Sequence, residues 1–321
     1  MILEDRSNDR QQKEECLMSK LDMLTGLRIS LASPEQIRAW SFGQVMNPHT
    51  INYLTSKPVP DGLFCERIFG PMQDWTCACR KYRHARTPGF VCDTCGVEVA
   101  PSRVRRERMG HIELAVPVVH SWLARGTPSI LALLLGLSPR QLAAVIAYSG
   151  YLVSEVDEEL RTEEMRLLDE NNAREQELGQ WLSRLAPGTF LGEDCYRELA
   201  LLYGDCFQAQ TGAEAVRQRL NTLDLDALAV SLRQVLHEKA ENQEKKVVKR
   251  LHVVEAFRRS GINPSWAVLE VIPVLPPDLR PLTHVGGGRF ATSDLNVFYE
   301  RVIARNAACG ALRYVVLLMR C

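Results

Sequence analysis

The sequence has no apolar run that could span a membrane and no excess of either charge. Its longest apolar stretch, residues 130–137, is far shorter than the ~20 residues that a transmembrane helix requires. No apolar segment with a small-residue cleavage site opens the chain, which disfavours secretion. Lys plus Arg and Asp plus Glu both total 39, so the net charge of zero points to no particular partner. We expect a soluble, cytoplasmic protein without a membrane partner.

Residue patterns that support catalysis are also missing. The chain contains no Gly-x-Ser-x-Gly elbow, and the glycines at 286–288 match neither of the two common phosphate-binding motifs. Asp224 and Asp226 form an Asp-x-Asp pair in a segment with leucines at helical spacing. Helical residues two positions apart do not face one point, whereas two-metal chemistry needs converging carboxylates. We therefore predict that the chain by itself contains no catalytic site.

Cysteine is the residue type that clusters. Cys77-Ala-Cys79 and Cys92-Asp-Thr-Cys95 are separated by twelve residues, while the remaining six cysteines are scattered. Two close pairs bridged by a short loop supply the four soft ligands of tetrahedral Zn²⁺, and four thiolates leave no open position for a catalytic water. The connecting loop is polar, so we expect the metal rather than an apolar core to hold it. Disulfides or neutral core thiols remain alternatives, and His84 in the loop is a poorer ligand candidate.

The neutral total hides a basic segment and an acidic one. Over residues 155–177, ten acidic residues outnumber three arginines. Over residues 77–110, eight basic residues outnumber three acids, and the eight are Arg80, Lys81, Arg83, Arg86, Arg103, Arg105, Arg106 and Arg108. Such a cluster beside a metal-held loop is typical of contact with nucleic-acid phosphates, although each arginine could instead pair with a nearby acid. Arg289 is a further candidate, at the tip of an expected mobile loop.

Hydrophobic spacing and turn residues predict an α+β fold with short strands and a helical region. Four prolines favour loops and short strands over residues 28–64. Strands are expected over 103–108, 112–119 and 266–274, and helices over 129–135 and 140–148, with Pro139 at a tolerated first-turn position. Leucines at helical spacing make residues 155–260 mostly helical. Ser293 is a suitable N-cap for a helix beginning at Asp294.

Several long strings occur in a fixed order along the chain. LASPEQIRAWSFGQV starts at residue 31, DGLFCERIFGP at residue 61, and the four clustered cysteines follow. RRERMGHIEL starts at residue 105, LPPDLRP at residue 275 and GGRFATSDLN at residue 287. Together these strings resemble the N-terminal end of the beta-prime subunit of bacterial DNA-directed RNA polymerase. The resemblance covers roughly residues 28 to 306 and does not rest on the cysteine spacing alone.

The resemblance implies a multi-part polymerase clamp fragment. In chain order it implies an N-terminal extension (1–27), a zipper-like segment near upstream DNA (28–64), a zinc-binding module (65–105), a largely helical clamp-like region (106–274), a lid-like loop (275–296), and the start of a clamp helix with a divergent C-terminal end (297–321). In the family, the lid helps to separate nascent RNA from the template strand, and the clamp helices dock sigma factor.

The resemblance also implies cofactors and partners. One structural zinc per chain is expected on Cys77, Cys79, Cys92 and Cys95. The expected partners are DNA, nascent RNA, the alpha, beta and omega subunits, the rest of beta-prime, and sigma factor. The Asn-Ala-Asp-Phe-Asp-Gly-Asp string that holds Mg²⁺ in this nucleotidyltransferase is absent, so the isolated chain is expected to be inactive and Mg²⁺ to bind only in the complete enzyme. The expected location is the nucleoid-associated cytoplasm of a bacterium.

The sequence departs from the family pattern after Asn306. Gly310 is predicted to weaken the helix there, and the apolar end suggests a truncated or frame-shifted chain, which leaves sigma docking open. A free-standing zinc-ribbon regulatory protein that binds nucleic acid is an alternative interpretation. A metalloenzyme would require an open zinc position.

Overall fold

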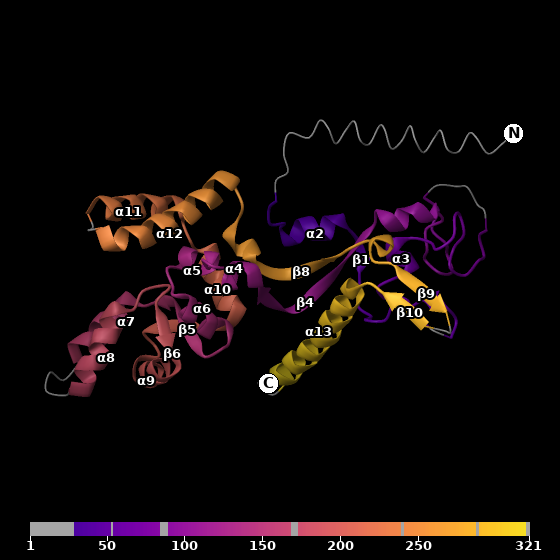
Figure 1. Ribbon diagram of the computed structural model, residues 1–321. Helices are drawn as coiled ribbons and strands as arrows, with labels where there is room; N and C mark the ends of the chain where they lie inside the picture. Colours follow the sequence, from indigo (N-terminus) through magenta and orange to yellow (C-terminus); the bar gives the residue numbers. More distant parts are fainter. Residues whose placement is uncertain are drawn as a thin grey trace. The chain divides into compact units, whose positions relative to one another are not determined.

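The structure, a computed structural model, describes residues 29–52, 54–83, 89–167, 173–238, 241–286 and 289–318 (Figure 1). Its fold class is α+β, as predicted. The helices are α2 (Pro34–Trp40), α3 (Glu66–Phe69), α4 (Ser121–Arg125), α5 (Ile130–Leu135), α6 (Pro139–Ile146), α7 (Glu158–Leu167), α8 (Ala173–Arg184), α9 (Glu193–Tyr203), α10 (Gly212–Asn221), α11 (Leu225–Glu238), α12 (Glu241–Ser260) and α13 (Asp294–Leu318), with 3-10 turns η1 (Ser102–Arg106), η2 (Pro264–Ala267) and η3 (Pro277–Leu279). The strands are β1 (Ser41–Gln44), β2 (Ile51–Asn52), β3 (Lys57–Pro58), β4 (Met109–Val119), β5 (Gly150–Val156), β6 (Phe190–Gly192), β7 (Phe207–Gln210), β8 (Val268–Val274), β9 (Leu282–Gly286) and β10 (Arg289–Thr292). The extension expected over residues 1–27 lies outside the described ranges.

The sheet with the longest strands has the order β1-β4-β8. β1 runs parallel to β4, and β8 runs antiparallel to it, with a register shift between Glu113 and Val118. Ile112 and Val274 pack in a buried cluster with Phe69 of α3 and Ile303 of α13. The strand expected over 112–119 is confirmed. The strand expected over 266–274 begins only at Val268, because the preceding residues form η2.

Local capping explains why α5 and α6 lie where the sequence predicts them. The Ser129 hydroxyl accepts a hydrogen bond from the Ala132 backbone N–H at 3.2 Å. Ser138 and Gln141 form a reciprocal capping box, with Pro139 directly after the cap. Such caps satisfy backbone donors that have no partner inside the helix. Both helices are therefore specified by residues within one turn of their first residue.

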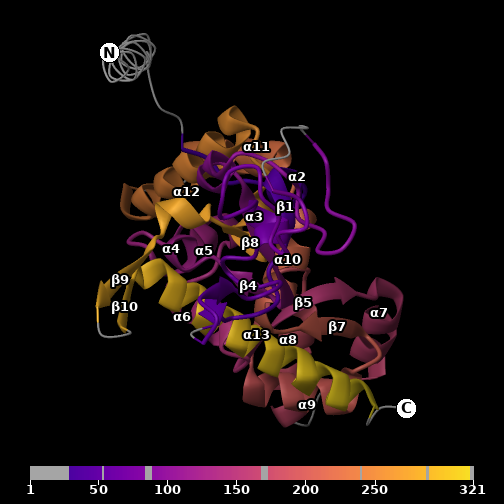
Figure 2. The same ribbon diagram turned by 90° about the vertical axis from the view of Figure 1, so that its right-hand side faces the viewer.

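The region expected to be mostly helical contains a second sheet. Its order is β6-β5-β7, with both outer strands antiparallel to β5. Leu182 of α8, Leu191 of β6 and Leu199 of α9 are fully buried in the core of this part. The expectation is therefore corrected for β6 and β7, which are too short to show alternation in the sequence. Beyond them, α11 and α12 do form a helical pair, side by side in both views (Figures 1 and 2).

The strand expected over residues 103–108 is wrong, because Ser102–Arg106 form the 3-10 turn η1. The carboxylate of Asp74 accepts hydrogen bonds from the Ser102 backbone N–H at 2.7 Å and from its hydroxyl at 2.6 Å. Val104 packs so closely on Gly70 that a Cβ there would lie 2.4 Å from a Val104 methyl. These contacts come from residues about thirty positions away, so the alternation of basic and apolar residues misleads.

β9 and β10 form an antiparallel hairpin that leads directly into α13 (Figure 2). A loop was expected around residues 286–288, but Gly286 and Arg289 are paired, while residues 287–288 lie outside the described ranges. α13 begins at Asp294 as predicted and continues past Gly310, which the sequence marked as a weak point. The helix packs on β4, with Ala115 facing Gly310. Tertiary packing thus compensates for the low helix propensity of glycine. Among the described residues, no helix is both long and apolar enough to cross a bilayer.

Candidate metal centre

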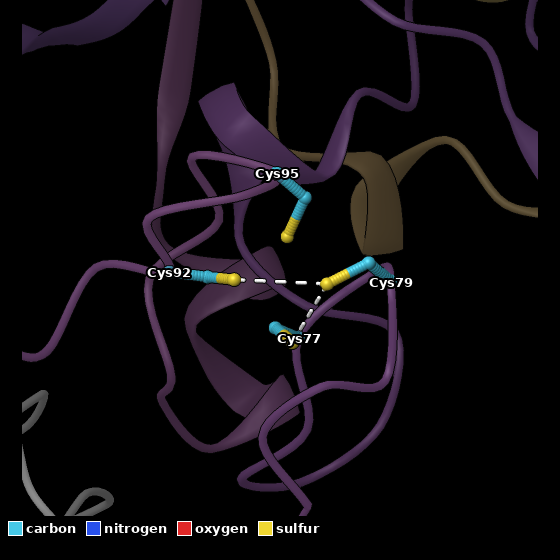
Figure 3. Close-up of side chains that lie close together, drawn as sticks. All are labelled: Cys77, Cys79, Cys92 and Cys95. Atoms are coloured by element: carbon cyan, nitrogen blue, oxygen red, sulfur yellow. Dashed lines mark hydrogen bonds between the residues drawn. The ribbon is translucent and has the colours of Figure 1, made fainter.

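The four clustered cysteines converge on one point (Figure 3). Their Sγ atoms all lie within 4.8 Å of one another. The Sγ atoms of Cys77 and Cys79 are 3.5 Å apart, and those of Cys79 and Cys92 are 3.6 Å apart. A tetrahedral Zn²⁺ with Zn–S bonds of about 2.3 Å separates its sulfurs by about 3.8 Å, whereas a disulfide is about 2.05 Å long. The geometry fits a four-thiolate metal site, and the described cysteines are all free thiols.

Two tight turns present the sulfurs. The Arg80 backbone N–H donates to the Cys77 carbonyl at 2.9 Å, and the Gly96 N–H donates to the Cys92 carbonyl at 2.8 Å. Arg80 and Gly96 both have positive φ, of 62° and 67°. The Tyr82 N–H also donates to the Cys77 sulfur at 3.3 Å. Such backbone donors orient a thiolate ligand before the metal arrives.

A small apolar cluster supports these turns. Val97 and Val99 are buried against Cys77 and Cys92. At the two ends of the connecting loop, the rings of Tyr82 and Phe90 meet edge to face at 4.8 Å. The loop residues 84–88, including His84 and Arg86, lie outside the described ranges. The expectation that metal alone holds this segment is therefore corrected, because apolar packing contributes as well.

The close packing of the sulfurs shifts the pKa values of two of the thiols in opposite directions. For the Cys79 thiol, a hydrogen bond from the Lys81 backbone lowers the pKa, but desolvation and the three facing sulfurs outweigh it and raise the pKa to about 12. For Cys92, desolvation raises the pKa, but hydrogen bonds from the backbones of Cys95 and Thr94 outweigh it and lower the pKa to about 7. Because four thiolates cannot coexist without a counter-charge, this donor set fits a divalent cation that replaces the shared protons.

Exposed arginine side chains lie near the cysteine cluster and on η1. The side chains of Arg80 and Arg83 are exposed beside the first cysteine pair, and those of Arg103 and Arg106 are exposed on η1. Asp74, which the sequence reasoning missed, attaches η1 to the module through Ser102, so the two pairs of arginines belong to one connected unit. The same hydrogen bonds hold the pKa of the Asp74 carboxyl below its usual range. No local sequence signal distinguishes Asp74 from other surface acids.

Lys81 and Arg105, two of the basic candidates, have partners within the fold, and so does Arg108. Lys81 forms an ion pair with Asp93 at 2.6 Å, and that carboxylate raises the pKa of Lys81. Arg105 is only 4% exposed, and its guanidinium donates to the carbonyls of Gly70 at 2.6 Å and Phe64 at 3.2 Å. The expectation that Arg105 contacts nucleic acid is therefore corrected, because its donors hold the backbone around α3. Arg289, the candidate outside residues 77–110, is the first residue of β10.

A second missed contact joins the module to the β1-β4-β8 sheet. Arg108 forms an ion pair with Glu98 at 2.6 Å, and its side chain is only 12% exposed. The same guanidinium lies over the ring of Phe42 on β1, 4.6 Å from its centre. Opposite charges ten residues apart are a weak sequence signal, and the contact with Phe42 depends on how β1 pairs with β4. Arg108 thus connects Glu98 of the cysteine-containing segment to Phe42 of β1.

The sequence matches the family model described as "RNA polymerase Rpb1, domain 1" over residues 22–313. The DNA-directed RNA polymerase subunit beta' of Caldicellulosiruptor saccharolyticus is 50% identical over 280 residues, which cover 87% of this chain and 22% of that protein. The subunit of Enterococcus faecalis is 48% identical over 289 residues (90% and 22%), and that of Geobacillus kaustophilus is 49% identical over 280 residues (87% and 21%). The chain thus spans about a fifth of the length of these relatives. It belongs to the RNA polymerase Rpb1 domain 1 family, in the region that forms the N-terminal part of bacterial beta-prime subunits.

Proposed function

We propose that this chain serves as the N-terminal part of a beta-prime subunit in a bacterial DNA-directed RNA polymerase. In that role it contributes a zinc-binding module, part of the DNA clamp and the lid. Its proposed partners are DNA, nascent RNA, the alpha, beta and omega subunits, the remainder of beta-prime and sigma factor. Support comes from the family membership and from one observation: exposed arginines are attached to a converged four-sulfur cluster.

Cys77, Cys79, Cys92 and Cys95 would hold the zinc. Zinc bound by four thiolates supplies no open coordination position, so its contribution is structural. The protein groups around the sulfurs orient and support them. The backbone N–H of Tyr82 orients one sulfur, and Val97 and Val99 pack against Cys77 and Cys92 beneath the turns. The result is a rigid support for the arginines around it.

Arg80, Arg83, Arg103 and Arg106 are proposed to contact DNA phosphates. Their side chains are exposed, and the two turns that carry them are linked through Asp74. Phosphate contacts hold a duplex in place without reading its bases, which suits an enzyme that transcribes any sequence. Each phosphate that the protein neutralises releases condensed counterions. The logarithm of the binding constant therefore falls linearly with the logarithm of the salt concentration, with a slope of about 0.9 per phosphate.

The salt dependence of DNA binding tests this proposal. We would place the segment in the beta-prime subunit of a reconstituted polymerase and replace Arg80 and Arg83 by Ala. The salt slope is expected to fall by about 0.9 for each phosphate that the variant no longer neutralises. The matched control replaces Arg184 and Arg197, which are exposed on α8 and α9, and should leave the slope unchanged. An unchanged slope in the first variant, with zinc content and assembly intact, would reject the phosphate contacts.

The assembly and the chemistry have their own tests. The tagged chain is expected to co-purify with the beta and sigma subunits, whereas purification as a lone monomer would favour a free-standing zinc-ribbon regulator. We propose that Mg²⁺ catalysis lies outside these 321 residues, because the Asp-rich string of the family is not among them. The isolated chain, given template, nucleotides and Mg²⁺, is expected to make no RNA. Template-dependent synthesis by pure chain would overturn this part.

A further inference from the structure

Arg280 lies in the interior between η3 and β9. Its side chain is 0% exposed, which makes it the largest fully buried side chain among the described residues. Arginine is almost never buried unless a carboxylate pairs with it. The acceptors that Arg280 uses here are carbonyl and amide oxygens. Burying a charged guanidinium on such acceptors costs free energy, so its position needs an explanation beyond packing.

The guanidinium joins three separate segments. Nε donates to the carbonyl of Leu275, after β8, at 2.8 Å, and one terminal nitrogen donates to Oδ1 of Asn296, in the first turn of α13, at 2.8 Å. The other terminal nitrogen donates to the carbonyl of Leu63, which precedes α3 and lies 217 positions away in the sequence. Three segments are thus fixed by one planar group.

Asn296 extends this connection to the hairpin. It is 2% exposed, and its Nδ2 donates to the Arg280 carbonyl at 3.0 Å and to the Thr292 hydroxyl at 2.9 Å. Thr292 is the last residue of β10 and pairs with Leu282, the first residue of β9. Arg280 and Asn296 therefore hold the base of the β9–β10 hairpin next to the first turn of α13.

Aromatic rings offset part of the cost of burying the charge. The guanidinium carbon lies 5.0 Å from the ring centre of Phe64, 5.3 Å from that of Phe69 and 5.7 Å from that of Tyr299. Rings at this range attract a cation, more strongly when both are desolvated. Burial lowers the pKa of Arg280 to about 10, so the side chain still carries its charge near neutral pH. The flat guanidinium can meet acceptors in three directions, which the compact ammonium of lysine cannot reproduce.

We propose that Arg280 is a positioning residue that sets the orientation of the β9–β10 hairpin and the start of α13 on the core around α3. This inference rests on the proposed function of the hairpin as the lid. Arg280 does not touch nucleic acid in this account. It acts through the hairpin, whose base it anchors to the carbonyl of Leu63.

The test uses Arg280→Lys, with Arg301→Lys as the matched control, since Arg301 is exposed on α13. In the 321-residue chain, amide hydrogen exchange over β9, β10 and the first turn of α13 should accelerate roughly tenfold or more in the Arg280 variant only. Exchange over β5–β7 should stay unchanged in both variants. In polymerase carrying the segment, the Arg280 variant should shift stalled complexes to a longer RNA–DNA hybrid, while the control should not.

A third variant separates this inference from the lid assignment. Deleting residues 285–290 removes the hairpin tip and should lengthen the hybrid if the hairpin is the lid. If the deletion has no effect, the lid assignment fails. If the deletion lengthens the hybrid but Arg280→Lys changes neither the hybrid nor the exchange at the hairpin, the positioning role is overturned. If Arg280→Lys does not fold, Asn296→Ala takes its place, because it removes the hydrogen bonds of Asn296 with Arg280 and Thr292. The same two measurements, amide exchange at the hairpin and hybrid length, then decide.

Discussion

Asn306 of α13 and Ala115 of β4 are joined by a hydrogen bond of 2.7 Å across 191 positions of sequence. The Asn306 side chain accepts from the Ala115 backbone N–H and donates to the Glu113 carbonyl, also at 2.7 Å. These two backbone groups lie where the β4–β8 register shifts, between Glu113 and Val118. One amide side chain thus satisfies an irregular stretch of strand and seats the long helix on it.

Replacing Asn306 by Ala is expected to destabilise the fold by ~1–3 kcal/mol, because a partly buried backbone donor and a partly buried backbone acceptor both lose their partner. Urea unfolding measures the change, and amide exchange along α13 should locate it. The control is Arg305→Ala, at an exposed neighbouring position, which should stay within ~0.5 kcal/mol of the original chain. Equal effects of the two substitutions would contradict the anchoring role of Asn306.

Loss of the metal should unfold the cysteine module and little else. Cys92→Ser, or treatment with a chelator, is expected to remove about one zinc per chain, because a four-thiolate site needs every ligand. Amides over residues 75–100 should then lose protection, while those of the β4–β8 pair keep theirs. Cys309→Ser serves as the control, since Cys309 is exposed on α13. A module that holds no zinc and stays protected after chelation would refute the metal site.

Substitution of Arg105 should destabilise the fold, whereas substitution of the nearby Arg103 should hardly change its stability. Arg105→Met leaves the carbonyls of Gly70 and Phe64 without their donor, and a cost of ~2–4 kcal/mol is expected. Arg103→Met should change the free energy of unfolding by less than ~0.5 kcal/mol, because Arg103 is exposed. Equilibrium unfolding in urea distinguishes them. The prediction fails if both variants are equally stable.

The ion pair between Arg38 and Glu113 predicts a dependence on pH. Arg38 donates to both carboxylate oxygens, at 2.7 and 3.1 Å, and this bond holds the pKa of Glu113 below its ordinary value of 4.5. A lowered carboxyl pKa stabilises the fold above the unfolded value, and the contribution disappears as pH falls through the folded value. Because both side chains are partly exposed, Arg38→Met should cost less than ~1 kcal/mol at neutral pH.

The measurement for this pair compares urea unfolding of both proteins at about pH 7 and about pH 3. The difference between the two proteins should shrink as the pH falls through the lowered pKa of Glu113. Glu113→Gln should remove the same contribution, so that adding Arg38→Met to it costs nothing further. A difference that persists at low pH would show that Arg38 acts through packing rather than through its charge.

Predictions from the sequence succeeded where the determining residues are close together. The capping box of α6 and the start of α13 at Asp294 depend on neighbours within a few positions. The convergence of the cysteines depends on two turns in a segment of nineteen residues. In each case the conformation follows from side-chain and backbone groups that the local sequence displays. That the sulfurs hold zinc and that the arginines meet DNA stay predictions.

Predictions failed where distant contacts override local preference. The sequence of η1 is typical of a strand, but Asp74 and Gly70 hold it as a turn. β6 and β7 exist because β5 pairs with them on both sides, which short segments do not reveal. The flanks of the expected lid-like loop pair as β9 and β10, as only the structure shows.

By itself the sequence determined the family, the four-sulfur cluster and the capped helices, because each is encoded by residues adjacent in the chain. Only the tertiary structure decided which arginines are surface groups and which are internal connectors. Nothing in the sequence separates Arg105 and Arg280 from the exposed arginines of this chain, yet their side chains are only 4% and 0% exposed. Their burial depends on carbonyl oxygens of Gly70, Phe64 and Leu63, whose positions are set by chain folding rather than by residue type. A backbone acceptor carries no sequence signature, so the partners of a buried arginine become visible only in three dimensions.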